Sequence, residues 1–217
     1  MDQRMNKNLE DQYRKNIGVK LELFNQMNTH LLRDEEPSQY FNGLPDDIMQ
    51  EGPFNLLYQL KKTQQSKKHH PEGNVWNHTM LVIDAAAKRK SKSNDARALM
   101  WAALLHDIGK PATTRKRNGK ITSYNHESVG ANIAKEFLLE FVHDLDLLKT
   151  VVSLIRWHMQ VLYVLNHLPF ADIHTMKKEV DVEELALLGY CDRLGRLGAN
   201  MMQEEKEIQT FIERCRK

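Results

Sequence analysis

The sequence predicts an all-α domain, an all-helical bundle that carries one small β-hairpin. Between residues 76 and 160, apolar side chains recur at steps of three and four residues, the period of an amphipathic helix. One segment breaks this pattern: in ATTRKRNGKITSY, residues 112–124, the Asn118-Gly119 pair favours a tight hairpin turn between β-compatible residues. With 217 residues, 41% of them hydrophobic, the chain is long enough to bury a core of its own.

Residues 1–70 are expected to form a helical N-terminal extension that packs on the core domain, residues 71–217. A helix is predicted over residues 6–32. Its apolar stripe consists of Leu9, Tyr13, Ile17, Leu21, Phe24 and Met27. Residues 33–47 are rich in Pro, Gly, Asn and Asp and are predicted to form a loop, which a short helix near residues 54–64 follows.

Five helices are predicted in the second part. Four of them span residues 76–90, 95–108, 127–141 and 146–160, and a capping box formed by Asp181 and Glu184 opens the fifth, which runs through Asp192. Gly109 is expected to end the second helix in a left-handed conformation, and Pro111 cannot continue the helix because it lacks an N–H.

Composition narrows the classes of partner and location. The 31 basic and 29 acidic residues leave a net charge of +2, so no global field attracts nucleic acid. No stretch approaches the roughly 20 apolar residues of a membrane span, and Cys191 and Cys215 form no CxxC spacing. We therefore expect a cytoplasmic protein with reduced thiols and no membrane partner. The concentrated basic stretches are Lys61, Lys62, Lys67 and Lys68, and Arg115, Lys116, Arg117 and Lys120.

A His-Asp pair marks the first candidate site. His106 and Asp107 are adjacent at the end of an apolar helix, in MWAALLHDIGK. A buried carboxylate is costly unless a charge compensates it, and a divalent cation would do so. Imidazole and carboxylate together suit magnesium or first-row metals rather than a thiolate-type zinc site. From these two residues alone, a His-Asp hydrogen bond at a helix end is the alternative.

Several motifs in order resemble the HD superfamily of metal-dependent phosphohydrolases. They are HPEGNVWNH, ALLHDIGK, the later His-bearing helices and CDRLGR, which together span about residues 71–196. The sequence is most similar to the HD domain of bacterial CCA-adding tRNA nucleotidyltransferases, because HDIGKPATT, NGKITSYNHESVGA and an Asp-Arg-x-Gly-Arg pattern follow in that order. The Gly-Ser motif and paired carboxylates of a nucleotidyltransferase head do not occur in these residues. We therefore expect the hydrolase module alone.

The resemblance implies a helical HD-domain bundle with a metal site. In this family one divalent ion would be bound by His78, His106, Asp107 and Asp192. Two-metal members use two more histidines, and His126 and His158 stand in the matching places. Asp107 has two oxygens and could bridge ions about 3.5–4 Å apart. A surface role for His126 and His158 is the alternative.

Substrate contacts are predicted from cations near these ligands. The resemblance places Lys110 at a substrate phosphate, with Asp107 as its catalytic partner, although a solvated lysine at the helix C-terminus is the alternative. Arg193 and Arg196 flank Asp192 and would hold a phosphate or pair with carboxylates. The loop that carries His69 and His70, SKKHHPEG, would form a rim of the site or a plain solvated loop.

The resulting hypothesis is a metal-dependent phosphohydrolase, a phosphodiesterase or phosphomonoesterase that acts on a nucleotide or RNA end through a metal-activated water. The alternatives are a hydrolase of free or signalling nucleotides and a non-catalytic, metal-stabilised regulatory module. The residues do not distinguish among Mg, Mn, Ni, Fe, Co and Zn, nor one ion from two. Oligomeric state is also left open.

Overall fold

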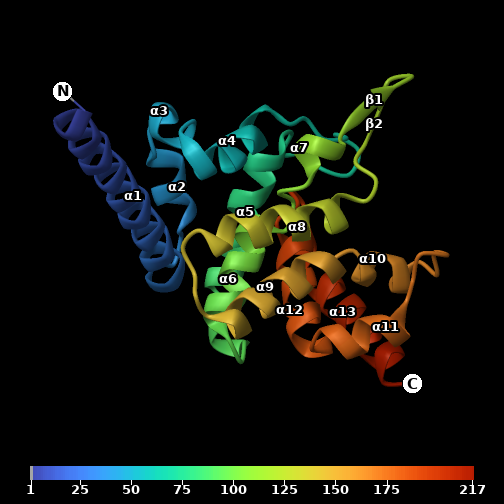
Figure 1. The fold of residues 1–217 in the computed structure, drawn as a ribbon. Helices are drawn as coiled ribbons and strands as arrows, with labels where there is room; N and C mark the ends of the chain where they lie inside the picture. The colour runs from blue at the N-terminus through green and yellow to red at the C-terminus, as the bar shows by residue number, and fades with distance from the viewer. Residues whose placement is uncertain (1) are drawn as a thin grey trace.

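The structure is a computed structural model that describes the backbone of residues 2–217 and the side chains of residues 17–217. The described chain is predominantly helical, which confirms the predicted class (Figure 1). The elements up to the hairpin are α1 (Asp2–Arg33), α2 (Ser38–Gly43), α3 (Asp46–Met49), η1 (Gly52–Phe54), α4 (Asn55–Lys62), α5 (Val75–Ala87), η2 (Lys90–Lys92), α6 (Ala96–Leu105) and α7 (Lys110–Thr113). After the hairpin come α8 (His126–Leu139), α9 (Leu145–Trp157), α10 (Gln160–Leu165), α11 (Ile173–Glu179), α12 (Val182–Leu194) and α13 (Met201–Arg216).

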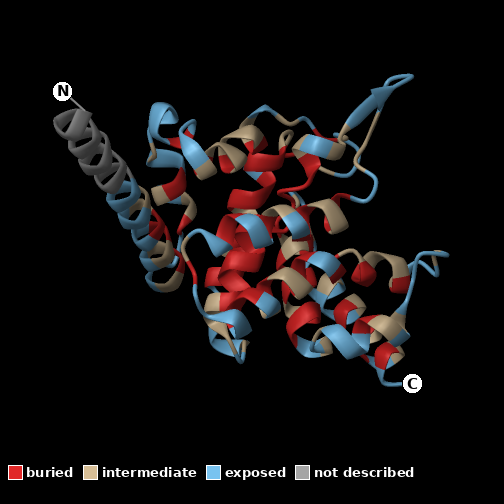
Figure 2. Ribbon diagram, in the orientation of Figure 1, coloured by how far each residue is buried: buried red, intermediate tan, exposed pale blue. Residues whose placement is uncertain are grey.

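Helices α5 and α6 form the centre of the molecule. They pack on each other, α9 and α12 pack against them, α8 packs on α9, and α13 covers α12. Both central helices are buried along most of their length (Figure 2). A helix that is apolar on nearly every side is stable only inside a fold. His78 on α5, and His106 and Asp107 directly after α6, therefore lie in the interior.

The C-terminal half of α1 packs on α6. Phe24 stacks on Trp101 and on Phe141, each with ring centroids 4.6 Å apart. The Asn28 side-chain oxygen accepts hydrogen bonds from Trp101 Nε1 (3.0 Å) and from Arg97 Nε (2.9 Å). Two stacked ring pairs and one shared acceptor thus hold the helix to the bundle.

The predicted apolar stripe of α1 is correct only in part. Phe24 and Met27 are buried as predicted, but Ile17 is 47% exposed and Leu21 is 43% exposed. Among the side chains described, from residue 17 on, the stripe is therefore buried from Phe24 onward. The predicted positions Leu9 and Tyr13 lie outside the residues whose side chains are described, and the domain boundary at residue 70 stays a prediction.

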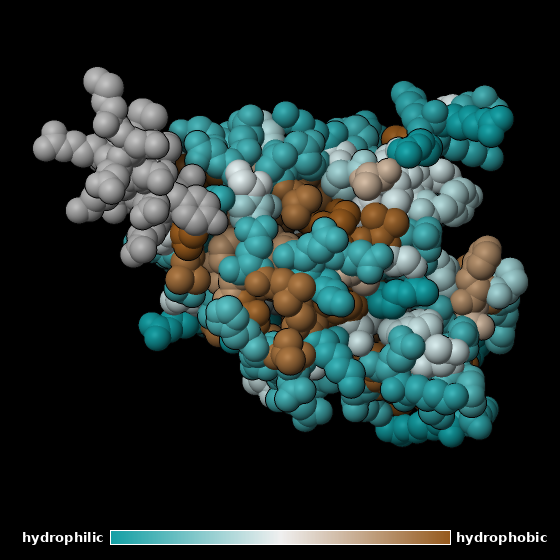
Figure 3. Space-filling view, in the orientation of Figure 1, coloured by the Kyte–Doolittle hydropathy of each residue, from teal (hydrophilic) through white to brown (hydrophobic). Residues whose placement is uncertain are grey.

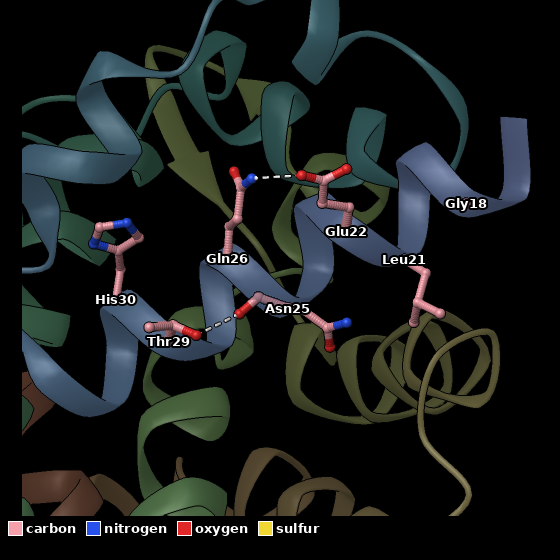
Figure 4. A pocket seen from close by; sticks show the side chains of 7 residues that line it. All are labelled: Gly18, Leu21, Glu22, Asn25, Gln26, Thr29 and His30. Atoms are coloured by element: carbon pink, nitrogen blue, oxygen red, sulfur yellow. Dashed lines mark hydrogen bonds between the residues drawn. The ribbon is translucent and has the colours of Figure 1, made fainter. Parts of the chain in front are cut away.

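A shallow hollow of about 460 Å³ runs along the same helix (Figure 4). Its side chains bond mainly within α1: Gln26 Nε2 donates to Glu22, and Thr29 Oγ1 donates to the Asn25 carbonyl. None of the predicted site residues lines this hollow. The hollow is therefore separate from the candidate metal site.

Two local predictions require correction. Residues 33–47 are not all loop, because α2 lies within them and α3 begins there. Ser38 donates to the Asp84 carboxylate from its backbone N (3.0 Å) and from Oγ (2.6 Å), a contact from distant sequence that supports α2. Asp181 does cap α12, but Glu184 accepts from Ser93 Oγ instead of completing a capping box.

The hairpin agrees with its sequence signature. Strands β1 (Arg115–Arg117) and β2 (Lys120–Thr122) pair antiparallel. Asn118 and Gly119 both have positive φ, 50° and 75°, as a type I′ turn requires. The tip projects from the body, and its surface is strongly hydrophilic (Figure 3).

Both cysteines are free and buried. Burial raises the pKa of Cys191 to about 12 and that of Cys215 to about 11. Neither thiol ionises near neutral pH, so neither offers a thiolate for a metal or a nucleophilic reaction. Across residues 2–217, the structure contains no helix that is long and apolar enough to cross a membrane.

Candidate metal centre

The four residues predicted to share one ion converge from distant segments. His78 lies on α5, His106 and Asp107 directly follow α6, and Asp192 lies on α12. His78 Nε2 is 2.9 Å from Asp192 Oδ1, and His106 Nε2 is 3.2 Å from Asp107 Oδ2. The rings of His78 and His106 are 5.4 Å apart between centroids. The first three side chains are buried, and Asp192 is half-buried.

His126 and His158 meet at the other oxygen of Asp107. His126 opens α8 and His158 follows the end of α9, so the packing of these helices places both imidazoles at the same end. Their Nε2 atoms lie 3.3 Å and 3.9 Å from Asp107 Oδ1. Asp107 therefore presents one oxygen to His106 and the other to this second pair.

Backbone contacts define the tautomer of three of these histidines. The Nδ1 atoms of His106, His126 and His158 lie 2.9, 2.7 and 2.7 Å from carbonyl oxygens of Ala103, Ser123 and Ile155 respectively. A carbonyl only accepts, so each Nδ1 carries a proton, and in the neutral ring each Nε2 presents a lone pair toward Asp107. The Nε2 atoms of His126 and His158 are only 3.3 Å apart.

Facing lone pairs at that separation repel unless a cation or proton lies between them. His106 Nε2 is also buried without a hydrogen-bond partner in the described part of the chain. Buried polar atoms normally have partners, and a group that lacks one calls for an ion or ligand. The donor set, three imidazole nitrogens around one carboxylate, therefore fits a divalent metal.

The charge states also suit metal ligands. Burial would raise the pKa of Asp107, but Lys110 and His106 outweigh burial and hold it well below its usual value. Burial, with nearby His126 acting in the same direction, lowers the pKa of His158 to about 3. Asp107 is thus ionised and His158 neutral at neutral pH, the forms that coordinate metals.

Glu72 joins the site, and the sequence analysis did not include it. Its Oε1 lies 2.9 Å from Nδ1 of both His78 and His70. Burial disfavours the charged form of both groups, but the contacts between imidazole and carboxylate outweigh it. Asp192 and Glu72 raise the pKa of His78 to about 9. His78 lowers the pKa of Glu72 to about 2. Its place in HPEGNVWNH was the one available signal.

The loop before Glu72 is a rim of the site rather than a plain solvated segment. His69 and His70 both line the cavity over the metal centre, although His69 is exposed. Burial lowers the pKa of His70 to about 4, and Lys110 contributes in the same direction. His70 is thus a neutral neighbour of the centre, and it is absent from the predicted ligand set.

Lys110 is buried, which rules out the solvated-lysine alternative. Its Nζ lies 2.7 Å from Asp107 Oδ2 and donates a 2.5 Å hydrogen bond to Gln65 Oε1. Gln65 is itself buried and donates to the Asn74 carbonyl. Lys110 is therefore an internal cation at the carboxylate and lines the cavity.

The two arginines predicted to contact substrate have different surroundings in the structure. Arg196 Nη2 lies 3.5 Å from Asp192 Oδ2 and lines the cavity. Arg193 does not line the cavity: its guanidinium donates to Glu204 and Glu207 of α13, the carboxylate pairing that the sequence left as its alternative. One residue along a helix turns the side chain by about 100°, whereas four residues return it to the same face. Arg193 thus ties α12 to α13.

Gly109 has a structural role different from the predicted one. Its φ is −81°, so it does not adopt the left-handed conformation, and Pro111 lies in the first turn of α7 rather than ending a helix. A Cβ on Gly109 would lie 2.2 Å from the His126 carbonyl oxygen and 2.6 Å from Gly130 N. The absence of a side chain lets the turn after Asp107 touch α8, which brings His126 to the site.

Gly109→Ala is expected to lower the free energy of unfolding by about 1–3 kcal/mol, the usual cost of overpacking, or by more. The neighbours are backbone atoms, which cannot move aside as a side chain would. Urea unfolding followed by circular dichroism measures the change. Gly43→Ala is the matched control, because a Cβ there meets nothing within 4 Å. Equal stability of the two variants would contradict the close-approach role.

The basic stretches do not form one patch. Lys61 pairs with Asp46 at 2.6 Å and Lys62 lies over the Tyr58 ring, so both are occupied elsewhere. Ser66 and His69, on either side of Lys67 and Lys68, line the cavity, as does Ile121 of the hairpin. The loop and the hairpin that carry the remaining charges therefore each contribute residues to the cavity wall.

Comparisons with known proteins identify the family of the chain. Residues 75–197, more than half of the chain, match the family described as HD domain. The chain is 33% identical over 102 residues to the multifunctional CCA protein of Actinobacillus pleuropneumoniae serotype 5b, covering 47% of this chain and 24% of that protein. It is 28% identical over 174 residues to that of Verminephrobacter eiseniae, covering 77% of this chain and 40% of that protein. It thus matches less than half the length of these relatives, and it belongs to the HD-domain family.

Proposed function

We propose that the protein is a metal-dependent phosphohydrolase that acts on a nucleotide or a nucleic-acid end as a phosphodiesterase or phosphomonoesterase. The observation that carries the proposal is the convergence of the Nε2 atoms of three buried histidines on the ionised carboxylate of Asp107. Membership of the HD-domain family supports the hydrolase class. The CCA relatives support the nucleotide or nucleic-acid substrate.

Six side chains would hold the metal. His78, His106, Asp107 and Asp192 would bind one ion, and the second oxygen of Asp107 with His126 and His158 would bind another. When bound, a divalent ion lowers the pKa of a coordinated water and neutralises negative charge on a phosphate. The protein's part is to hold Asp107 ionised and His158 neutral at the base of the cavity.

Lys110 and Arg196 would orient the substrate. Both line the cavity, and each lies beside a carboxylate of the metal set. A phosphate oxygen would accept from the third Nζ–H of Lys110, because Asp107 and Gln65 take the other two. The two cations would place the phosphorus atom between the metal ligands and solvent, and both contacts strengthen as charge develops.

A hydrolysis panel tests the proposal. The substrates are p-nitrophenyl mono- and diesters, nucleoside mono- and triphosphates, 2′,3′-cyclic nucleotides and a 3′-phosphorylated oligonucleotide, each with magnesium, manganese, nickel, cobalt and zinc. We expect turnover that requires a metal, stops with EDTA and persists in the surface control Leu145→Ala. Full metal binding without turnover of any substrate would instead support the regulatory module.

Glu72→Gln is expected to weaken metal binding by about 10- to 100-fold, as loss of a carboxylate behind a ligating histidine does. Glu72 lies on Nδ1 of His78, so it directs Nε2 toward the metal and raises the basicity of the ring. Titration with manganese, followed by electron paramagnetic resonance of the free ion, measures the affinity. Glu205→Gln, an exposed position outside the site, is the control. An unchanged manganese affinity would refute this role of Glu72.

A further inference from the structure

The cavity above the metal centre has an aromatic wall that the hydrolytic residues do not use. It measures about 430 Å³ and is lined both by Asp107, His126, His158 and Asp192 and by Tyr124, Tyr163 and Phe170. Tyr124 is 81% exposed and Phe170 is 65% exposed. Large apolar groups left in water at a pocket mouth are typical of a binding surface.

Hydrogen bonds from α10 hold the backbone around Phe170 in place. Buried Gln160 donates from Nε2 to the Phe170 carbonyl at 3.0 Å and accepts from the Asp172 backbone N at 2.8 Å. Phe170 leans on Tyr163, with ring centroids 5.6 Å apart. The loop between α10 and α11 therefore presents this ring without needing a ligand to order it.

The Tyr124 side is attached to the metal centre itself. Tyr124 lies in the turn between β2 and α8, next to Asn125, which has a φ of 62°. Ser123 in the same turn accepts from His126 Nδ1. Tyr163 lies five residues after His158 on the facing segment. Each half of the wall is thus connected through a few residues to one of the two histidines at Asp107 Oδ1.

We propose that Tyr124, Tyr163 and Phe170 form a nucleobase subsite and that the substrate is a nucleoside phosphate. A flat aromatic base stacks on such rings whatever its sequence, whereas Lys110 and Arg196 in the same cavity favour an anion. The cavity volume lies in the range of small-molecule sites, about 300–1,000 Å³. The phosphate part of this proposal rests on the proposed function. The nucleobase part is supported by the aromatic residues alone.

Binding of a nucleoside tests the base end without hydrolysis. Saturation-transfer NMR is run on the full chain with adenosine, and with ribose as the ligand that lacks a base. We expect transfer to the adenine protons but not to ribose, and a dissociation constant about 5- to 100-fold weaker in Phe170→Ala, the range for loss of one stacking ring. Phe170→Tyr is expected to retain affinity. Leu145→Ala is the control, an exposed apolar position (70%) outside the cavity.

Hydrolysis separates this proposal from the function on which it rests. We expect the KM for adenosine monophosphate to rise in Phe170→Ala by about the same 5- to 100-fold, with the KM for ribose 5-phosphate unchanged. Hydrolysis of both esters with equal KM in the wild type would overturn the subsite and leave the phosphohydrolase standing. Adenosine binding that depends on Phe170, with no hydrolysis of any ester, would support the subsite and overturn the phosphohydrolase. Equal binding of adenosine and ribose would overturn the subsite.

A free nucleotide and the last nucleotide of an RNA share this chemistry. The same assay compares adenosine 3′-monophosphate with a short oligoadenylate that ends in a 3′-phosphate. A preference for the oligonucleotide that disappears at high salt would assign an RNA end, because contacts to additional phosphates are salt-dependent. Equal KM values would assign the free nucleotide.

Discussion

Asp107→Ala is expected to abolish hydrolysis, whereas Lys110→Met lowers turnover by about 10²–10³-fold, the usual loss for one electrostatic contact. Asp107 is 2% exposed, and its two oxygens face two different donor sets, so its removal disables both. Lys110 contributes one charge beside the same carboxylate. Single-turnover kinetics with the best substrate of the panel measures both losses.

The Asp107 comparison needs a check on folding. Removal of the carboxylate leaves Lys110 buried without its ion pair, which destabilises the chain independently of catalysis. Asp107→Asn keeps the shape of the side chain, and thermal unfolding of each variant shows whether it is folded in the assay. Equal and mild losses in the folded Asp107 and Lys110 variants would indicate that the centre is not catalytic.

The wild-type protein is expected to bind two manganese ions per chain, and His126→Ala or His158→Ala is expected to bind one. The two imidazoles share Asp107 Oδ1, while His78 and Asp192 contact each other 2.9 Å apart at the other part of the centre. Loss of either imidazole should therefore leave the first ion in place. Turnover falls because charge on the phosphate is less neutralised.

Equilibrium dialysis with manganese gives the number of ions. His143→Ala is the matched control, because His143 is exposed and lies outside the cavity. Unfolding temperatures should change little among the histidine variants in EDTA. One ion in the wild type, and the same number in both site variants, would reduce His126 and His158 to substrate-contact or structural roles.

Most of the secondary structure is predictable because its causes are local. The apolar periodicity of α5, α6, α8 and α9 and the Asn118-Gly119 turn lie within a few residues of the elements they specify. The boundaries are less predictable. Gly109 was assigned a local role, as a helix end, but the structure uses it for contact with His126 and Gly130. A glycine that lets two backbone segments pack closely looks the same in the sequence as a glycine in a turn. The two are distinguished only when the segment packed against the glycine is known.

The sequence also determined the proposed ligands and their chemistry. His106 and Asp107 are adjacent, and the ordered motifs of the HD family identified His78, Asp192, His126 and His158 before the fold was described. The structure brings these side chains together around Asp107, and their role as metal ligands stays a prediction. Whether they bind one ion or two stays a prediction, which the manganese count tests.

Only the tertiary structure decided which neighbours serve the site. In the sequence, Arg193 and Arg196 are both arginines close to Asp192, and nothing local distinguishes them. In the fold, Arg193 binds Glu204 and Glu207 of α13, whereas Arg196 lines the cavity. Glu72 and Gln65 lie in a polar loop and gain a role only because α5 and the Asp107 turn bury them. Tyr124 and Phe170 face one cavity from segments 46 residues apart. Periodicity and motifs report on interactions within a turn or two of the chain, and these contacts join segments far apart in sequence, so they exist only once the helices have packed.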